Sequence, residues 1–253
     1  MKTKPTLNIF LEVIFICISV VALSFLLAGC KCSFDGPTSS PSNIRVIVLV
    51  DETDSFRVII DNEQSAGGKD TIQYWEAVKP LVIQIVKKLD PGDQFVFIGI
   101  DEKGFQTDDV RIPFEIIDES YLKAEQQKKR IIREVRELER KKDIHNATDI
   151  LGALKHSASL DSGYQTRIFC FSDMQQFPPL NPQEATGLKF SQDTKVYFFL
   201  NTVGEQEWNR TVSIWKPIIE GAGLKFVDKG PDANFIEFTN SNVRLPEILA
   251  NWK

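Results

Sequence analysis

Short, almost unbroken apolar runs alternate along the chain with longer stretches in which apolar residues recur every three or four positions. The runs are rich in β-branched and aromatic residues and cover residues 44–50, 94–100, 167–173 and 195–203. Such runs are typical of parallel strands covered on both faces. The stretches with helical spacing cover residues 71–89, 119–142, 146–160, 207–221 and 243–252. This alternation predicts one doubly wound α/β domain, Rossmann-like, with a mostly parallel sheet flanked by helices.

Weaker patterns complete the prediction. They indicate strands over residues 56–60, 110–117, 224–227 and 235–238. Pro80 interrupts the helical pattern of residues 71–89 and should kink that helix or mark its true start. Asn146 or Thr148 is expected to cap the helix that follows. The helix over residues 119–142 has a partial apolar stripe made of Leu122, Ile131, Val135 and Leu138.

The N-terminus has a different character. Lys2 and Lys4 precede a strongly apolar stretch over residues 7–26, which ends in Leu27-Ala28-Gly29-Cys30. This is the layout of a bacterial secretory signal (residues 1–29) that ends in a lipobox, so Cys30 is expected to carry lipid. Residues 30–43 then form a flexible tether, rich in Ser and Pro, and residues 44–253 form the domain. Because the apolar stretch is near the length that spans a bilayer, an uncleaved anchor is the alternative. Either arrangement places the domain in the cell envelope, outside the cytoplasm.

Composition narrows the classes of function. The 253 residues are 42% hydrophobic and 26% charged, as expected of a protein that forms a core, and the formal net charge is −5. That charge argues against nucleic acid as a partner. Cys170 lies in an apolar run and is expected to be a core residue, and no disulfide framework or Cys/His metal cluster is indicated. The helix over residues 119–142 is locally basic. It is interpreted as a solvated face, with contact to anionic lipid or an acidic partner as the alternative.

Polar residues stand where three of the predicted elements meet loops. Asp51, Thr53 and Ser55 follow the first strand and offer a carboxylate and two hydroxyls at alternate positions. Thr148 lies at a later loop-to-helix junction, and Asp173 ends another buried strand. Open α/β sheets bind their ligands at the carboxyl ends of strands, and Mg²⁺ and Mn²⁺ prefer oxygen ligands. These residues therefore predict a divalent-metal site.

The order and spacing of these residues resemble the von Willebrand factor A (vWA) domain over roughly residues 44–240. The metal-ion-dependent adhesion site of that family has D-x-[ST]-x-S, a distant Thr and a later Asp. By this resemblance, Thr53, Ser55 and Thr148 would bind the metal through hydroxyls, while Asp51 and Asp173 would supply negative charge, partly through water. The resemblance implies Mg²⁺, with Mn²⁺ or Ca²⁺ as alternatives. It also implies a protein partner whose acidic side chain completes the coordination.

Several alternatives are open at this point. Glu52 and Asp54 add charge beside the site, and they either point away or tighten metal binding at the expense of an acidic partner. Haloacid dehalogenase-like phosphatases also place a catalytic Asp after their first strand, but they need a second Asp two residues later, where this chain has Thr53. The main expectation is therefore a binding module and not an enzyme. A scaffold or assembly lipoprotein with a purely structural metal site is the further alternative. The segments over residues 56–70 and 119–142 depart from the family pattern and are candidates for partner selectivity.

Overall fold

Nearly all described residues belong to the domain predicted over residues 44–253, with gaps between the described ranges. The structure is a computed structural model, and it describes residues 43–52, 57–61, 69–100, 109–139, 148–161, 164–175, 180, 185–201, 204–230 and 232–253. Cys30, the signal peptide and nearly all of the tether lie outside these residues, so they stay predictions. No helix in the described ranges is long and apolar enough to cross a bilayer.

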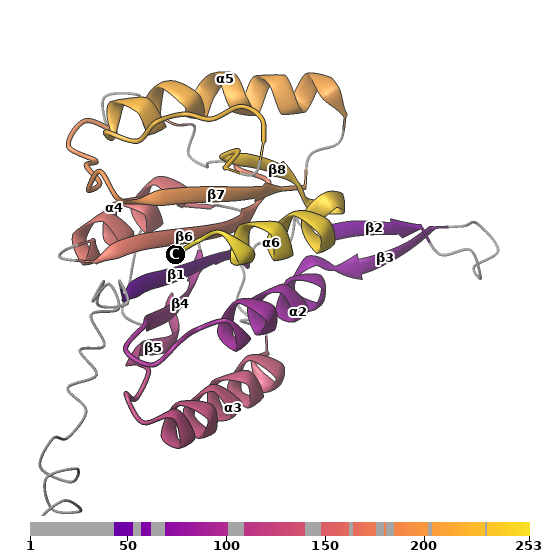
Figure 1. The fold of residues 1–253 in the computed structure, drawn as a ribbon. Coiled ribbons are helices and arrows are strands. Elements are labelled where there is room, and N and C mark those ends of the chain that lie inside the picture. The colour runs from indigo at the N-terminus through magenta and orange to yellow at the C-terminus, as the bar shows by residue number, and fades with distance from the viewer. Residues whose placement is uncertain are drawn as a thin grey trace, which may run out of the picture. The chain divides into compact units, whose positions relative to one another are not determined.

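A six-stranded sheet organises the domain (Figure 1). Its strand order is β5-β4-β1-β6-β7-β8. The strands are β1 (Ile44–Asp51), β4 (Gln94–Ile100), β5 (Val110–Ile116), β6 (Gln165–Ser172), β7 (Lys195–Leu200) and β8 (Phe235–Glu237). All neighbouring pairs are parallel except β4 with β5, which is antiparallel. The doubly wound, mostly parallel α/β fold predicted from the sequence is thus confirmed.

Helices cover both faces of this sheet. On one face lie α2 (Tyr74–Lys87), α3 (Tyr121–Glu137) and α6 (Ser241–Ala250), and on the other lie α4 (Ile150–Leu160) and α5 (Glu205–Gly221). Alternate residues of β1 serve the two layers, because successive side chains of a strand point to opposite faces. Val48 packs on the α2 side and Leu49 on the α4 side. Since both apolar layers are complete within residues 44–253, the domain has its own core.

The sequence prediction is wrong at the start of the first helix. Residues 71–73 belong to β3 (Lys69–Gln73), which pairs antiparallel with β2 (Arg57–Asp61) in a separate two-stranded sheet. Thr71 and Ile72 are β-branched and favour a strand once a pairing partner is present. The helix begins at Tyr74, so Pro80 lies inside it and does not mark its start.

Three further predictions need correction. The helix predicted over residues 119–142 is shorter, ending at Glu137, and Leu122 is 73% exposed instead of lying in the apolar stripe. Residues 224–227 form no strand; at Val227, the amide donates to the Asn234 side chain at 2.6 Å and the carbonyl accepts from the Asn234 amide at 2.9 Å. The helix cap is Asp149, whose side chain accepts from the Gly152 amide at 2.8 Å.

Candidate metal site

The strand order reverses between β1 and β6. The chain leaves β1 on one side to form β4 and β5, and it later forms β6, β7 and β8 on the other side. In doubly wound sheets, ligands bind outside the carboxyl ends of the two strands where the order reverses. Here Asp51 is the last residue of β1, Ser172 is the last residue of β6, and Asp173 follows it. We call this the carboxyl edge, and the opposite edge the amino edge.

A hydrogen bond joins the ends of these two strands. The Ser172 hydroxyl donates to Oδ2 of Asp51 at 2.9 Å and accepts from the Met174 amide, also at 2.9 Å. The parallel register of β1 and β6 makes this contact, since it pairs Val50 with Phe171 just before the two polar residues. Asp51 is buried, and burying a carboxylate is costly unless polar groups compensate for it. Ser172 therefore orients the Asp51 carboxylate.

Asp173 begins a tight turn. Its Oδ1 accepts a hydrogen bond from the Gln175 amide at 2.8 Å. Between them, Met174 has a φ of 60°, which is rare for a residue with a side chain, and the indole of Trp215 donates to its carbonyl at 3.1 Å. Strained backbone of this kind persists where the surrounding structure enforces it, and it concentrates at functional sites. Helix α5 thus supports the turn that carries Asp173.

The position of Thr148 is set by helix α4. Thr148 is buried and stands two residues before α4. The other end of α4 is fixed at the amino edge, because Thr166 near the start of β6 donates to the Asp161 carboxylate at 2.6 Å. The helix has 11 residues, and at 1.5 Å per residue it spans about 16 Å. Thr148 therefore lies beyond the end of α4 that is away from the amino edge.

Glu52, which adjoins Asp51, faces away toward β4 and β5. Arg111 of β5 donates from Nη1 to both oxygens of the Glu52 carboxylate, at 2.9 and 2.7 Å. The carboxylate lies over Gly99, where an added Cβ would come within 2.4 Å of Oε1. Arg111 also donates to the Glu139 carbonyl just beyond α3. Of the two interpretations given for Glu52, the structure favours pointing away, with its charge offset by Arg111.

The buried Asp51 carboxylate affects the pKa of the Cys170 thiol. Burial, and after it the charge of Asp51, raises the pKa of the Cys170 thiol well above its ordinary value. Cys170 is a fully buried core residue, as predicted.

The predicted ligand set is only partly described. Asp51 and Asp173 share the carboxyl edge and Thr148 precedes α4, whereas Thr53 and Ser55 lie outside the described residues. Within the described ranges, no group of three or more His, Cys, Asp or Glu side chains could hold a metal ion. The predicted site does not depend on such a group, because hydroxyls make up much of it. Buried carboxylate and hydroxyl oxygens suit Mg²⁺ or Ca²⁺ in chemistry, and ligation by these residues stays a prediction.

Sequence reasoning did not identify the supporting residues. Ser172 was visible as a polar residue ending an apolar strand, but its bond to Asp51 depends on the register of β1 and β6. Arg111 had no such signal, since it lies 59 positions from Glu52.

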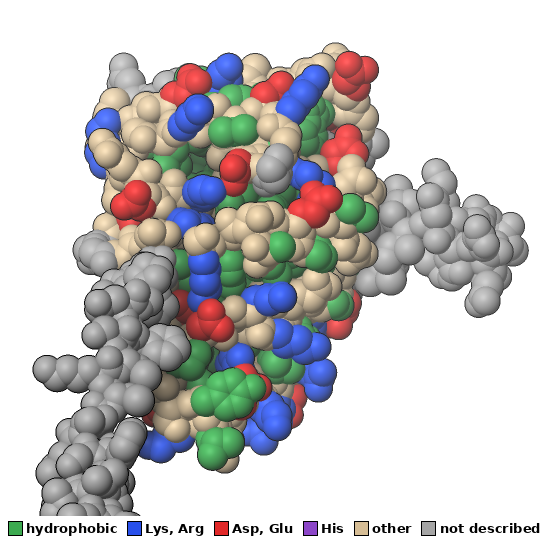
Figure 2. All heavy atoms as spheres, in the orientation of Figure 1, with side chains coloured by type: hydrophobic (Ala, Val, Ile, Leu, Met, Phe, Trp, Pro, Cys, Tyr) green, Lys and Arg blue, Asp and Glu red, His purple; other side chains and the backbone are tan. Residues whose placement is uncertain are grey.

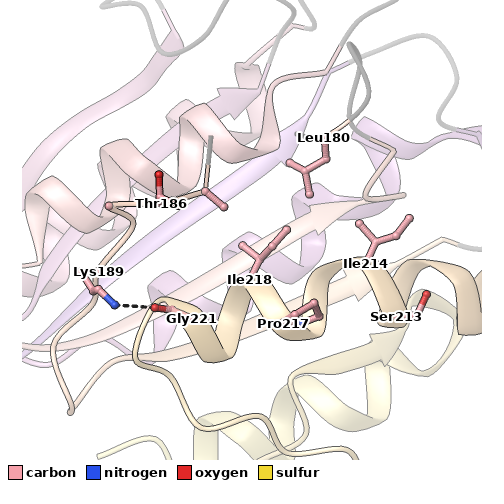
Figure 3. Close-up of a pocket in the computed structure, with 10 residues that line it drawn as sticks. Leu180, Thr186, Lys189, Ser213, Ile214, Pro217, Ile218 and Gly221 are labelled. Carbon is pink, nitrogen blue, oxygen red and sulfur yellow. Dashed lines mark hydrogen bonds between the residues drawn. The ribbon is translucent and has the colours of Figure 1, made fainter. Parts of the chain in front are cut away.

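A separate cavity of about 650 Å³ lies along α5 (Figure 3). Leu180, Ile214 and Ile218 point into it, and the Lys189 ammonium donates to the Gly221 carbonyl at 2.7 Å on its rim. No acidic side chain is among its described lining residues. This cavity is therefore distinct from the candidate metal site.

Comparison with known proteins identifies the fold but no family. No family model and no curated protein matches the chain. An aerotolerance-related membrane protein from Bacteroides fragilis is 13% identical, with 81% of this chain and 96% of that chain covered and a TM-score of 0.50. Proximal thread matrix protein 1 from the mussel byssus is 17% identical, with 82% and 47% covered and a TM-score of 0.51. A von Willebrand factor type A structure from Catenulispora acidiphila is 12% identical, with 83% and 42% covered and a TM-score of 0.49. The chain thus spans about half the length of the mussel protein.

Proposed function

We propose that this chain is a membrane-anchored, extracytoplasmic vWA-type binding module. In this proposal, a divalent metal is held by Asp51, Thr53, Ser55, Thr148 and Asp173, and a protein partner is captured through it. The observation that carries the proposal is the hydrogen bond between Ser172 and Asp51. It joins the strand end that bears Asp51 to the one that leads into Asp173, at the point where the strand order reverses.

The electrostatics next to this edge suit an acidic partner. The bound metal would supply a positive centre for an acidic side chain of the partner, since Mg²⁺ keeps ligand positions that water otherwise fills. Glu52 would repel that side chain if its charge were uncompensated. Arg111 offsets this charge and draws the carboxylate over Gly99. The chain's own residues therefore reduce the repulsion that the sequence alone suggested.

The topology is also consistent with attachment through Cys30. The chain enters the sheet at Ile44, the first residue of β1, whereas Asp51 is the last. A strand of 8 residues rises about 26 Å at 3.3 Å per residue. The tether that leads to Cys30 therefore joins the sheet at the edge opposite Asp51. Replacing Cys30 with Ala in the full chain should abolish incorporation of labelled palmitate; unchanged incorporation would contradict the lipid anchor.

Thermal unfolding of residues 33–253 tests the metal site. Metal that binds only the folded domain stabilises it by about 2.7 kcal/mol at one hundred times its dissociation constant. For a domain of this size, that free energy raises Tm by roughly 5–11 °C. We expect this shift with Mg²⁺, Mn²⁺ or Ca²⁺ relative to chelator, and we expect Asp51→Ala to lose it.

The control is Asp232→Ala, because Asp232 is an exposed acid that pairs with Lys195 away from the carboxyl edge. Its metal-dependent shift should equal that of the natural sequence. The absence of a metal-dependent Tm shift in the natural sequence would refute the proposed metal site. An equal loss of the Tm shift in both variants would mean that the metal does not bind at Asp51. Hydrolysis of a generic phosphomonoester by the metal-loaded domain, lost in Asp51→Ala, would instead favour the phosphatase alternative.

A further inference from the structure

An apolar corner is exposed where β5 ends and α3 begins. Six large hydrophobic side chains are exposed in the described part of the chain, and four of them fall within nine residues: Phe114, Ile116, Tyr121 and Leu122. Tyr121 and Leu122 are the most exposed of the six, at 70% and 73%. Exposed apolar groups gathered in this way are typical of an interaction surface.

A row of unpaired basic side chains continues from this corner along the helix. Leu122, Lys129, Arg133 and Arg136 are separated by seven, four and three positions, so they lie on one face of α3. All four are exposed, and none of the three basic side chains has an ion-pair partner among the described residues. We call Tyr121 together with these four residues the α3 outer face. Figure 2 shows Lys and Arg side chains gathered over α3, with hydrophobic side chains at its lower end.

The other three basic side chains of α3 each have an acidic partner, although Lys123 is exposed and lies 4.0 Å from Asp118. Arg130 binds Glu115 and Glu134, and Lys128 binds Glu125 and the Leu89 carbonyl. The helix as a whole has six basic and three acidic residues, a net charge of +3 in a chain whose net charge is −5. The positive charge that remains unpaired is therefore concentrated on the outer face.

The chain enters the domain at the same edge as the apolar corner. Register pairs Arg45 at the start of β1 with Gln94, and Gln94 with Ile116 at the end of β5. Tyr121 follows Ile116 by five residues. The tether predicted over residues 30–43 could reach up to roughly 45 Å at 3.3 Å per residue, which is enough for the domain to lie on its side.

Strand addition by another protein does not account for this surface. The outer edge of β5 is unpaired in the sheet, but Pro113 lies in the middle of the strand and has no amide hydrogen to donate. A combination of an exposed Tyr and Leu with unpaired Lys and Arg instead suits the boundary of an anionic bilayer, where aromatic residues occupy the interface and basic residues the headgroups.

We propose that the α3 outer face rests on an anionic membrane, with Tyr121 and Leu122 in the interfacial layer and the three basic residues on the headgroups. This inference relies on the membrane attachment included in the proposed function, and it is independent of the metal site. Contact of this kind would fix the orientation of the domain on the surface to which it is tethered.

Vesicle binding by residues 33–253 tests the contact. The vesicles are made of phosphatidylcholine alone or of equal parts phosphatidylcholine and phosphatidylglycerol, and the domain is added in solution. We expect binding to the anionic vesicles only, weakened by salt as the screening length falls from about 10 Å at 0.1 M to about 3 Å at 1 M. Replacing Lys129, Arg133 and Arg136 with Gln should lower the partition coefficient about fivefold for each charge removed.

A second pair of variants tests whether binding depends on the apolar corner or on any exposed hydrophobic side chain. Tyr121→Ser with Leu122→Ser should lower binding, whereas Val243→Ser, which removes a 63% exposed side chain from α6, should not. Equal binding to neutral and anionic vesicles, or binding unchanged by the charge-neutralised variant, would overturn the proposal, as would an absence of binding to the anionic vesicles. All measurements are made in chelator and without Cys30, so a failure here is distinct from a failure of the metal site or of lipidation.

Discussion

Replacing Arg111 with Met should destabilise the domain far more than the loss of a surface ion pair. The side chains of Arg111 and Glu52 are only 12% and 2% exposed. Removing the arginine leaves the Glu52 carboxylate buried without this counter-charge, a change that costs about 3–5 kcal/mol. The variant also loses the bond to the Glu139 carbonyl and the packing of the guanidinium over the Trp75 ring, at 5.6 Å from its centroid. For a domain of this size, that cost lowers Tm by roughly 6–20 °C.

Urea unfolding of residues 33–253, followed by tryptophan fluorescence, measures this cost. The control is Lys195→Met, because Lys195 and Asp232 form an ion pair whose side chains are 40% and 53% exposed. Such a pair contributes about 0–1 kcal/mol. In a double-mutant cycle, Glu52→Gln should recover part of the stability lost in Arg111→Met, since it removes the stranded charge. If Arg111→Met lowered the free energy of unfolding by no more than Lys195→Met, the buried ion pair would contribute no more than an exposed one.

Two other expectations follow from groups in the core. Gly99→Ala should destabilise the domain by about 1–3 kcal/mol, because its Cβ would lie 2.4 Å from the pinned Glu52 carboxylate, and Glu52→Ala should remove most of that penalty in urea unfolding. An equal penalty in both backgrounds would contradict the contact. Burial, and after it the charge of Asp232, raises the pKa of Tyr197 from 10.0 to about 12. The stability conferred by its neutral phenol is therefore complete below pH 10 and is lost as the pH rises toward 12, which the difference between the natural sequence and Tyr197→Phe should reveal. Ionisation of Tyr197 near pH 10 in the folded domain would contradict this.

The sheet could be predicted because its central strands have no polar face. In β1 and β4 every residue is buried, so an unbroken apolar run was a sufficient signal. The β2–β3 hairpin was missed at Thr71 because helical spacing continues through that position, and only pairing with β2 decides the local conformation. Leu122 was assigned to the core for a similar reason. Spacing identifies a helix face, but it does not identify which residues of that helix lie beyond the sheet.

The candidate site also contains residues that the sequence predicts and contacts that it does not predict. Asp51, Thr148 and Asp173 could be selected because each stands at the end of an element whose type was readable from the sequence. The contacts that hold the site together could not be predicted from the sequence. Ser172 reaches Asp51 through strand register, and Arg111 reaches Glu52 from an edge strand two positions away in the sheet. Such contacts are properties of the assembled sheet and have no local signature in the chain.

The bond between Asp51 and Ser172 also has a consequence for folding. The two residues are 121 positions apart, and β6 pairs with the side of β1 opposite β4. Contacts of such long range form slowly, since the entropy of closing the loop must be overcome before the contact contributes. A chain that has folded only as far as β5 therefore lacks half of the candidate site. Binding at this edge would then distinguish fully folded molecules from partly folded ones and would stabilise only the fully folded ones.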